Sequence, residues 1–188
     1  MSKKPTAAGK SSIDLIDQDA AFAQIITDSA AAYLDLACGA GNYTLALARR
    51  LGKDSSIHAL DLWEDGVAAL QESARREGLD NVTARVADIT RPLPLPDGSI
   101  DVCLIATALH DIPEARRGRV LAEAGRVLRP GGRLALIEFK KSDQGPGPSK
   151  ERKIGEADAE ELAAPHGFRK DISVSLGEYT YLVRFVRN

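Results

Sequence analysis

A turn of small residues follows an apolar run in the segment DLACGAGNYT, residues 35–44. Gly39 and Gly41 carry no side chain, so a ligand can approach the backbone of this turn closely. Asp61 follows about 20 residues later, at the end of a second apolar run, where a carboxylate can accept hydrogen bonds from both hydroxyls of a ribose. A tight turn alone would also explain the glycines, but the glycines together with this acid favour a nucleotide-type ligand.

Two further residues bear on the charge of that ligand. The dinucleotide-binding fingerprint has a third small residue for close helix packing, and Thr44 stands in its place. Asp35 lies at the mouth of the turn, where its carboxylate repels a pyrophosphate. A ligand with ribose, adenine and positive charge, such as S-adenosylmethionine, therefore matches better than a nicotinamide dinucleotide. A nicotinamide-dependent oxidoreductase stays open as the alternative.

Strand and helix patterns alternate along most of the chain. Helical spacing separates five apolar runs that predict buried strands: AAYLDLA, SSIHALD, NVTARVAD, SIDVCLIATAL and RLALIEF. The segments KDISVSL and EYTYLVRFV alternate in polarity and predict a terminal antiparallel pair. Before the first strand, the spacing predicts a lead-in helix with Ser12 as its N-cap. The pattern predicts a doubly wound α/β sheet with its ligand at the carboxyl ends of the strands.

Length and charge bound the class of protein. The 188 residues are 44% hydrophobic and carry a net charge of -2. We expect one domain over residues 11–188, after a disordered tail at 1–10. The near-neutral charge offers no footprint for nucleic acid and favours a small-molecule substrate. Without a leader or an apolar run of membrane-spanning length, we expect a cytoplasmic protein that makes no membrane contact, and the cysteine spacing predicts no metal site.

Four segments, in order, resemble the motifs of class I S-adenosylmethionine-dependent methyltransferases, and in particular the small stand-alone members of the type 11 kind. They are DLACGAGNYT, HALDLW, VADITRPLPLPDGSIDVCLIATALHDI and AGRVLRPGGRLALIEF. The resemblance runs from about residue 12 to the C-terminus and implies a single methyltransferase domain. It implies a seven-stranded Rossmann-like sheet of order 3-2-1-4-5-7-6, with the last strand antiparallel and helices on both faces. The implied cofactor is S-adenosylmethionine, with S-adenosylhomocysteine as product.

The resemblance also assigns cofactor contacts residue by residue. Around the methionine part it implies Asp35, Ala37, Gly39 and Gly41, with Ala37 departing from the more usual glycine. Around the ribose and adenine it implies Asp61, Leu62, Asp88 and Ile89. Trp63 either lies beside the adenine as well or is an ordinary half-buried aromatic. At the end of the fourth strand the implied contacts are Ala106 and Thr107.

Methyl transfer is an in-line displacement, which an enzyme promotes mainly by alignment and by excluding water. His110, just after the fourth strand, is the candidate general base if the acceptor must lose a proton, and a histidine that packs the next helix is the alternative. Asp111 is expected to cap the helix that follows Pro113. Lys140 follows the fifth strand, where it could attract an anionic acceptor or simply belong to a solvated face.

The methyl acceptor is expected to be a small molecule. The fourth strand is followed by ATALHD instead of an Asn-Pro-Pro-Tyr type of segment, and the chain has no large insertion for substrate recognition. A protein or RNA methyltransferase stays open as an alternative. So does a module that binds S-adenosylmethionine without catalysis.

Overall fold

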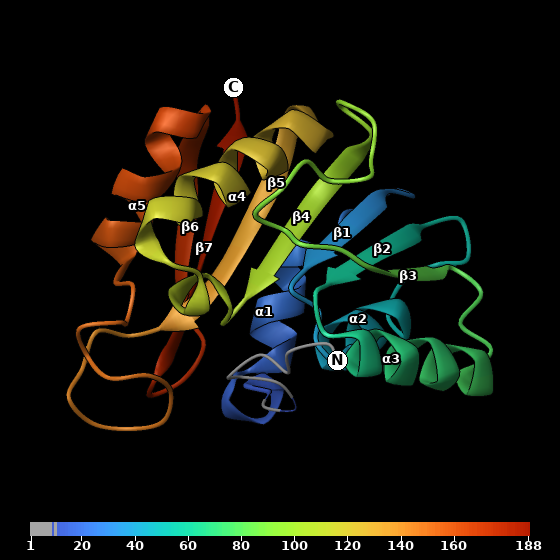
Figure 1. The fold of residues 1–188 in the computed structure, drawn as a ribbon, viewed down its shortest axis with the longest axis horizontal. Coiled ribbons are helices and arrows are strands. Elements are labelled where there is room, and N and C mark those ends of the chain that lie inside the picture. The colour runs from blue at the N-terminus through green and yellow to red at the C-terminus, as the bar shows by residue number, and fades with distance from the viewer. Residues whose placement is uncertain (1–8, 10) are drawn as a thin grey trace.

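The computed structural model describes residue 9 and residues 11–188, so the tail predicted at 1–10 lies almost entirely outside the described residues. A single sheet runs through the molecule (Figure 1). Its strands are β1 Ala32–Leu36, β2 Ser56–Asp61, β3 Val82–Val86, β4 Ile100–Ala106, β5 Leu128–Phe139, β6 Phe168–Ser175 and β7 Thr180–Arg187. The helices are α1 Gln18–Ile25, α2 Asn42–Ala48, α3 Glu64–Glu77, α4 Glu114–Val127 and α5 Glu156–Ala163.

The seven strands lie in the order β3-β2-β1-β4-β5-β7-β6. Neighbours from β3 to β5 pair in parallel, whereas β7 runs antiparallel to both β5 and β6. The predicted doubly wound fold and its strand order are confirmed. The chain changes direction of winding between β1 and β4, and in such sheets the crevice beyond the carboxyl ends of those strands binds the ligand.

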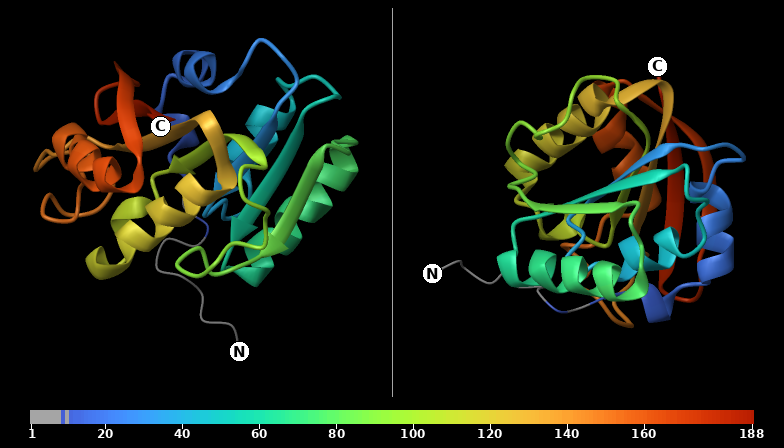
Figure 2. Two further views of the ribbon diagram at one scale, coloured as in Figure 1. Left: turned by 90° about the horizontal axis from the view of Figure 1, so that it is seen from above. Right: turned by 90° about the vertical axis from the view of Figure 1, so that its right-hand side faces the viewer.

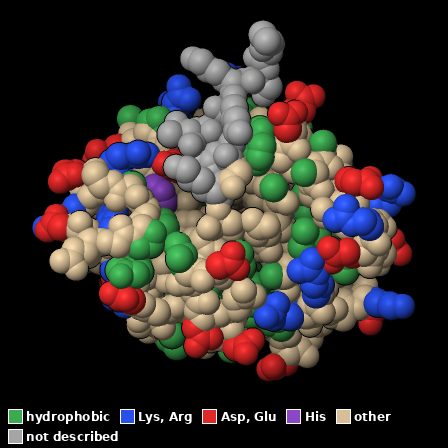
Figure 3. Space-filling model, turned by 90° about the horizontal axis from the view of Figure 1, so that it is seen from below, with side chains coloured by type: hydrophobic (Ala, Val, Ile, Leu, Met, Phe, Trp, Pro, Cys, Tyr) green, Lys and Arg blue, Asp and Glu red, His purple; other side chains and the backbone are tan. Residues whose placement is uncertain are grey.

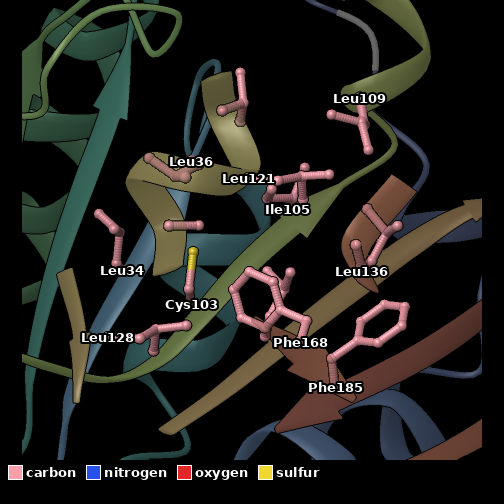
Figure 4. Close-up of a cluster of buried hydrophobic side chains, with 14 of the residues drawn as sticks. Leu34, Leu36, Cys103, Ile105, Leu109, Leu121, Leu128, Leu136, Phe168 and Phe185 are labelled. Atoms are coloured by element: carbon pink, nitrogen blue, oxygen red, sulfur yellow. The ribbon is translucent and has the colours of Figure 1, made fainter. Parts of the chain in front are cut away.

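Side chains of the central strands pack on both faces of the sheet, and helices cover both faces (Figures 1 and 2). Leu34 and Leu36 of β1 belong to a cluster with residues of α4 and α5, whereas Tyr33 belongs to a cluster with residues of α1 and α2. Figure 4 shows the first cluster, in which Phe168 and Phe185 of the terminal strands also lie. Burial on both faces explains why the strands were apolar without alternation.

The N-terminal segment differs from the prediction. A short 3-10 helix covers Ile13–Leu15, Ile16 is extended, and α1 begins only at Gln18. The N-cap of α1 is Asp17, whose carboxylate accepts a hydrogen bond from the third residue beyond it at 3.0 Å. The predicted N-cap, Ser12, makes no capping hydrogen bond in the described chain, because its hydroxyl bonds to two side chains distant in sequence.

Two further observations concern the described part of the chain as a whole. None of its helices has the length and apolar character needed to cross a bilayer. Its His, Cys, Asp and Glu side chains form no group of three or more that could hold a metal ion.

Candidate cofactor and acceptor site

The turn after β1 has an unusual backbone conformation. Ala37, Gly39 and Gly41 have positive φ angles of 63°, 55° and 85°, in the region that L-residues rarely adopt. A Cβ added at Gly41 would lie 2.3 Å from Cδ1 of the buried Leu70, whereas one added at Gly39 would meet nothing within 4 Å. Gly41 is therefore needed for packing between the turn and α3, and Gly39 leaves the turn open to a ligand.

Asp61 at the end of β2 is held by backbone donors. One carboxylate oxygen accepts from the N–H of Gly39 at 2.8 Å, and the other accepts from the N–H of Trp63 at 2.7 Å. A carboxylate offers about four lone-pair positions, so each oxygen can accept one more hydrogen bond. The group is 9% exposed and faces the space beside the turn. This geometry fits the two adjacent hydroxyls of a ribose.

Asp88 follows β3 and is fixed by its own turn. Its Oδ1 accepts from both the N–H and the hydroxyl of Thr90, at 2.9 and 2.7 Å, while Oδ2 lies 3.4 Å from Nε of Arg91. Partial burial raises the pKa of Asp88, but the hydrogen bonds from Thr90 and the charge of Arg91 outweigh it and hold the pKa below its ordinary value. The group is thus an ionised acceptor whose Oδ2 can take a hydrogen bond from an amino group.

Asp35 lies deeper in the fold than Asp61. Its side chain is buried, and Thr44 donates a hydrogen bond to its Oδ2 at 2.5 Å. Burial raises the pKa of Asp35 to about 7; the Thr44 bond opposes this change and the charge of Asp61 adds to it. Thr44, which stands where the dinucleotide fingerprint has a third glycine, is therefore the hydrogen-bond donor that holds this acid.

A cavity of about 770 Å³ opens at the carboxyl ends of the strands. Among the predicted site residues, those that line it are Ala37, Gly39, Asp61, Leu62, Asp88, Ile89, Ala106 and Thr107. Those that do not are Asp35, Gly41, His110 and Lys140. Trp63 also lines the cavity and is partly exposed, which fits both interpretations of this residue, beside the adenine or as a half-buried aromatic. Figure 3 shows the molecule from this side, with acidic and basic side chains intermingled on the visible described surface.

Another part of the cavity wall comes from the segment after β4 and from the long loop after β5. Its residues are Ala108, Asp111, Ile112, Pro113, Arg116 and Arg152. Asp111 accepts a hydrogen bond from Arg152 at 2.5 Å, and the N-cap of α4 is Pro113, so the prediction that Asp111 caps this helix was wrong. The two arginines were not predicted as site residues. Arg152 could have been suspected only from its place in a Gly- and Pro-rich loop after a strand.

His110 lies behind this wall. Its Nδ1 is 2.6 Å from Oε2 of Glu138 on β5, its backbone N–H donates to Oε1 at 3.2 Å, and its Nε2 is 3.6 Å from Oδ2 of Asp111. Both His110 and Glu138 are buried. Because an ionised carboxylate only accepts, we assign the proton to Nδ1, which leaves Nε2 facing Asp111. Glu138 was missed, although an acid inside the apolar run RLALIEF was its signal.

Lys140 points to a different part of the molecule. Its ammonium group donates to the hydroxyl of Ser175 at 2.8 Å and to the carbonyl oxygen of Gly177 at 2.6 Å. These contacts fasten the end of β5 to the turn between β6 and β7. Lys140 does not line the cavity, so its predicted role toward an anionic acceptor stays a prediction.

The groups around the turn fit S-adenosylmethionine better than a dinucleotide. Asp61 and Asp88 supply acceptors for ribose hydroxyls and an adenine amino group, and the exposed Leu62 and the buried Ile89 supply apolar surface for the ring. Among the described residues that line the cavity, the basic ones are Arg116 and Arg152, and neither belongs to the glycine turn. The turn therefore has the carboxylate of Asp61 beside it and no basic side chain of its own, which suits a cation better than a pyrophosphate.

A family model described as a methyltransferase domain matches residues 34–132. Because the match covers more than half of the chain, the chain belongs to the methyltransferase domain family, and the resemblance seen in its motifs is confirmed. The family and the fold together imply S-adenosylmethionine as the cofactor.

Individual relatives agree with this family. The chain is 33% identical to the demethylmenaquinone methyltransferase of Lactiplantibacillus plantarum over 124 residues, which are 65% of this chain and 51% of that protein. The chain thus spans about half the length of the curated relatives it matches. A SAM-dependent methyltransferase from Aquifex aeolicus superimposes with a TM-score of 0.85 at 25% identity, covering 98% of this chain and 95% of that one.

A third comparison limits what the fold can tell. The cyclase SpnF superimposes with a TM-score of 0.77 at 20% identity, covering 90% of this chain and 78% of that one. At that identity the likeness shows the fold alone. Because a protein described as a cyclase has this fold, the reaction must be argued from the site and the relatives.

Proposed function

We propose that this chain transfers a methyl group from S-adenosylmethionine to a small-molecule acceptor. One observation carries the proposal: a single cavity of about 770 Å³ joins the turn beside Asp61 and Asp88 to a second wall at Asp111 and Arg116. The first part offers the acceptors that a ribose and an adenine need. The second part provides further wall residues, against which an acceptor molecule can bind next to the cofactor.

Bound in this cavity, the cofactor would supply a methyl group on a positively charged sulfur. The chain's own residues align the two reactants and keep water away. Asp61 and Asp88 hold the nucleoside through hydrogen bonds, which fixes the direction in which the methyl group points. Ala108, Ile112 and Pro113 give the wall an apolar surface that limits the water beside the acceptor.

Proton removal from a hydroxyl acceptor falls to the pair of Asp111 and His110 in this proposal. Asp111 lines the cavity and His110 does not, so Asp111 is the member that meets the acceptor. His110 stands behind it with Nε2 3.6 Å from the carboxylate, and Glu138 fixes the ring through Nδ1. In this step the proton passes from the acceptor hydroxyl to Asp111 and from there to Nε2 of His110 through one bridging water, because 3.6 Å exceeds the reach of a direct hydrogen bond.

The relatives narrow the choice of acceptors to test. Those named demethylmenaquinone methyltransferases act, by their name, on a quinone, and we propose a quinone-type aromatic compound, taken in its reduced, hydroxylated form, as the acceptor class for this chain.

The test supplies methyl-labelled S-adenosylmethionine together with small hydroxylated aromatics, reduced demethylmenaquinone among them. Label in a small product, lost in Asp61→Ala, is the expected result. Label in a protein or RNA fraction of a cell extract would favour a macromolecular acceptor. Binding of S-adenosylhomocysteine without label transfer to any tested fraction would favour a module that binds the cofactor without catalysis.

A further inference from the structure

Ser12 is a buried polar residue at the start of the described chain, 3% exposed. Its Oγ lies 2.8 Å from the hydroxyl of Tyr43 and 2.8 Å from Oγ1 of Thr107. Tyr43 belongs to α2 and Thr107 follows β4, so this serine joins three segments distant in sequence. The three hydroxyls form one hydrogen-bonded chain, which we call the hydroxyl latch.

Tyr43 and Thr107 of the latch both line the cavity that we assign to the cofactor, as does Ser11 of the N-terminal segment, by which we mean residues 11–17. Through Ser11 this segment forms part of the cavity wall. Its other end is fixed to the turn between β6 and β7, since the N–H of Asp17 donates to the carbonyl oxygen of Leu176 at 2.8 Å. Between that anchor and the cavity, the side chains of the latch join the segment to α2 and to the residue that follows β4.

Thr107, one member of the latch, has a strained backbone conformation. It has a φ of 47°, in a region that a β-branched residue adopts only when its surroundings hold it there. Its N–H donates to the carbonyl oxygen of Ile137 at 2.7 Å, and its side chain is held by Ser12. Strained residues of this kind gather at functional sites. We therefore connect the strained backbone of Thr107 with the shape of the cavity wall to which this residue belongs.

A second pair of hydroxyls, on Tyr33 and Thr27, provides a comparison for the latch away from the cavity. Tyr33 on β1 is also buried, and its hydroxyl lies 3.1 Å from Oγ1 of Thr27 in the segment before that strand. Neither residue lines the cavity. This pair gives the buried Tyr33 hydroxyl a partner away from the cavity, whereas the latch joins two cavity-lining residues to the segment that contributes Ser11 to the cavity wall.

We propose that the hydroxyl latch of Ser12, Tyr43 and Thr107 holds the N-terminal segment closed over the cofactor and sets the rate at which cofactor and product leave. Ser12 is a positioning residue, which acts through Thr107 and Tyr43. The inference rests on the cofactor assigned to the cavity and adds an exit step governed by these three hydroxyls.

The experiment measures dissociation of S-adenosylhomocysteine by stopped-flow displacement with excess S-adenosylmethionine. Trp63 is the reporter, since it is the chain's only tryptophan and lines the cavity. Tyr43→Phe, which loses only the bond between Tyr43 and Ser12, should speed dissociation about three- to tenfold, the effect of losing one hydrogen bond between neutral groups. Ser12→Ala, which loses the bonds to both Tyr43 and Thr107, should speed it at least as much. The double variant should dissociate no more than about twofold faster than Ser12→Ala, because Ser12→Ala already removes the bond that Tyr43→Phe breaks.

Tyr33→Phe is the matched control. It removes a buried tyrosine hydroxyl of the same kind away from the cavity, so dissociation should keep the native rate even if the unfolding free energy falls. Equal rates for native, Ser12→Ala and Tyr43→Phe protein would overturn the latch and leave the cofactor assignment intact. So would additive effects of the two substitutions. A native chain that binds no S-adenosylhomocysteine would overturn both the latch and the proposed function.

Discussion

The two parts of the cavity wall are built in different ways. On the cofactor side, Asp61 and Asp88 stand at strand ends and accept hydrogen bonds from residues near them in their own turns or in the adjoining glycine turn. On the acceptor side, Asp111 pairs with Arg152 across 41 residues of sequence, and His110 pairs with Glu138 across 28. The first part is made from backbone and local turns, and the second from side chains that only the tertiary fold brings together.

This difference separates stability from ligand binding. Substitutions of acceptor-side side chains should weaken the fold or the chemistry and spare cofactor affinity. Substitutions of cofactor-side acids should weaken cofactor affinity and leave the free energy of unfolding close to that of the native chain. The glycine turn belongs to both categories, since one of its glycines contacts the core and another faces the cavity.

The largest effect is expected at Glu138, which is fully buried against His110. Glu138→Ala leaves the backbone N–H and the Nδ1–H of His110 without an acceptor and should lower the free energy of unfolding by about 2–6 kcal/mol, roughly 1–3 kcal/mol for each buried donor. Glu138→Gln keeps an acceptor for the ring and should cost less. Urea unfolding measures both, and calorimetry at low temperature should find cofactor affinity within about twofold of native. A large loss of affinity in the folded Gln variant would contradict the separation.

The next effect compares two glycines of one turn. Gly41→Ala should lower the free energy of unfolding by about 2–4 kcal/mol, because the new Cβ meets Leu70 and must adopt a positive φ. Gly39→Ala has the positive φ but open space, so it should cost about 1 kcal/mol and mainly reduce cofactor affinity. Equal stability losses in urea unfolding would show that packing against α3 does not distinguish the two positions.

The division between the cofactor side and the acceptor side also separates what could be predicted from the sequence from what could not. The doubly wound sheet was predicted from apolar runs and glycine turns, which are local signals, whereas the strand order was predicted only from the resemblance to a methyltransferase family. The cavity-facing positions of Asp61 and Asp88 follow from their place at strand ends, which a one-dimensional pattern can show.

The parts that escaped prediction depend on partners distant in sequence. Ser12 looked like an N-cap because serine precedes a helical pattern there, but Tyr43 and Thr107 take its hydroxyl and the helix begins at Gln18. Arg152 reaches the cavity only because its loop folds back to Asp111. Local propensity contains no information about such partners, so tertiary contacts decided these positions.

Asp35 gives a prediction for pH. Burial raises the pKa of Asp35 to about 7 in the folded chain from an ordinary value of 3.8. Between these values the folded chain holds a proton that the unfolded chain has released. The free energy of unfolding therefore falls as pH rises from about 4 to 7, by at most roughly 1.4 kcal/mol per pH unit, and levels off above that range. Urea unfolding at several pH values measures the slope.

Asp35→Asn is the variant that isolates this group. It cannot ionise, so its profile between pH 5 and 7 should be flatter than that of the native chain. A matched substitution at the exposed Asp65 should leave the slope unchanged. If Asp35→Asn keeps the native slope, another group must account for the dependence on pH.

The smallest effect is expected at Lys140. Its ammonium group bonds to Ser175 and Gly177 outside the cavity, so Lys140→Ala should change methyl transfer by no more than about twofold once an acceptor is known. A tenfold rise in the KM of the acceptor would restore the role predicted from sequence.

The central claim is that the acid-lined turn binds an adenosyl sulfonium cofactor, and titration calorimetry tests it most directly. The native chain should bind S-adenosylhomocysteine, and Asp61→Ala should weaken that binding by more than about tenfold, since two hydrogen bonds to a charged acceptor are lost. Asp65→Asn should bind as the native chain does. Heat from a reduced nicotinamide dinucleotide without heat from S-adenosylhomocysteine, or unchanged affinity in Asp61→Ala, would contradict the claim.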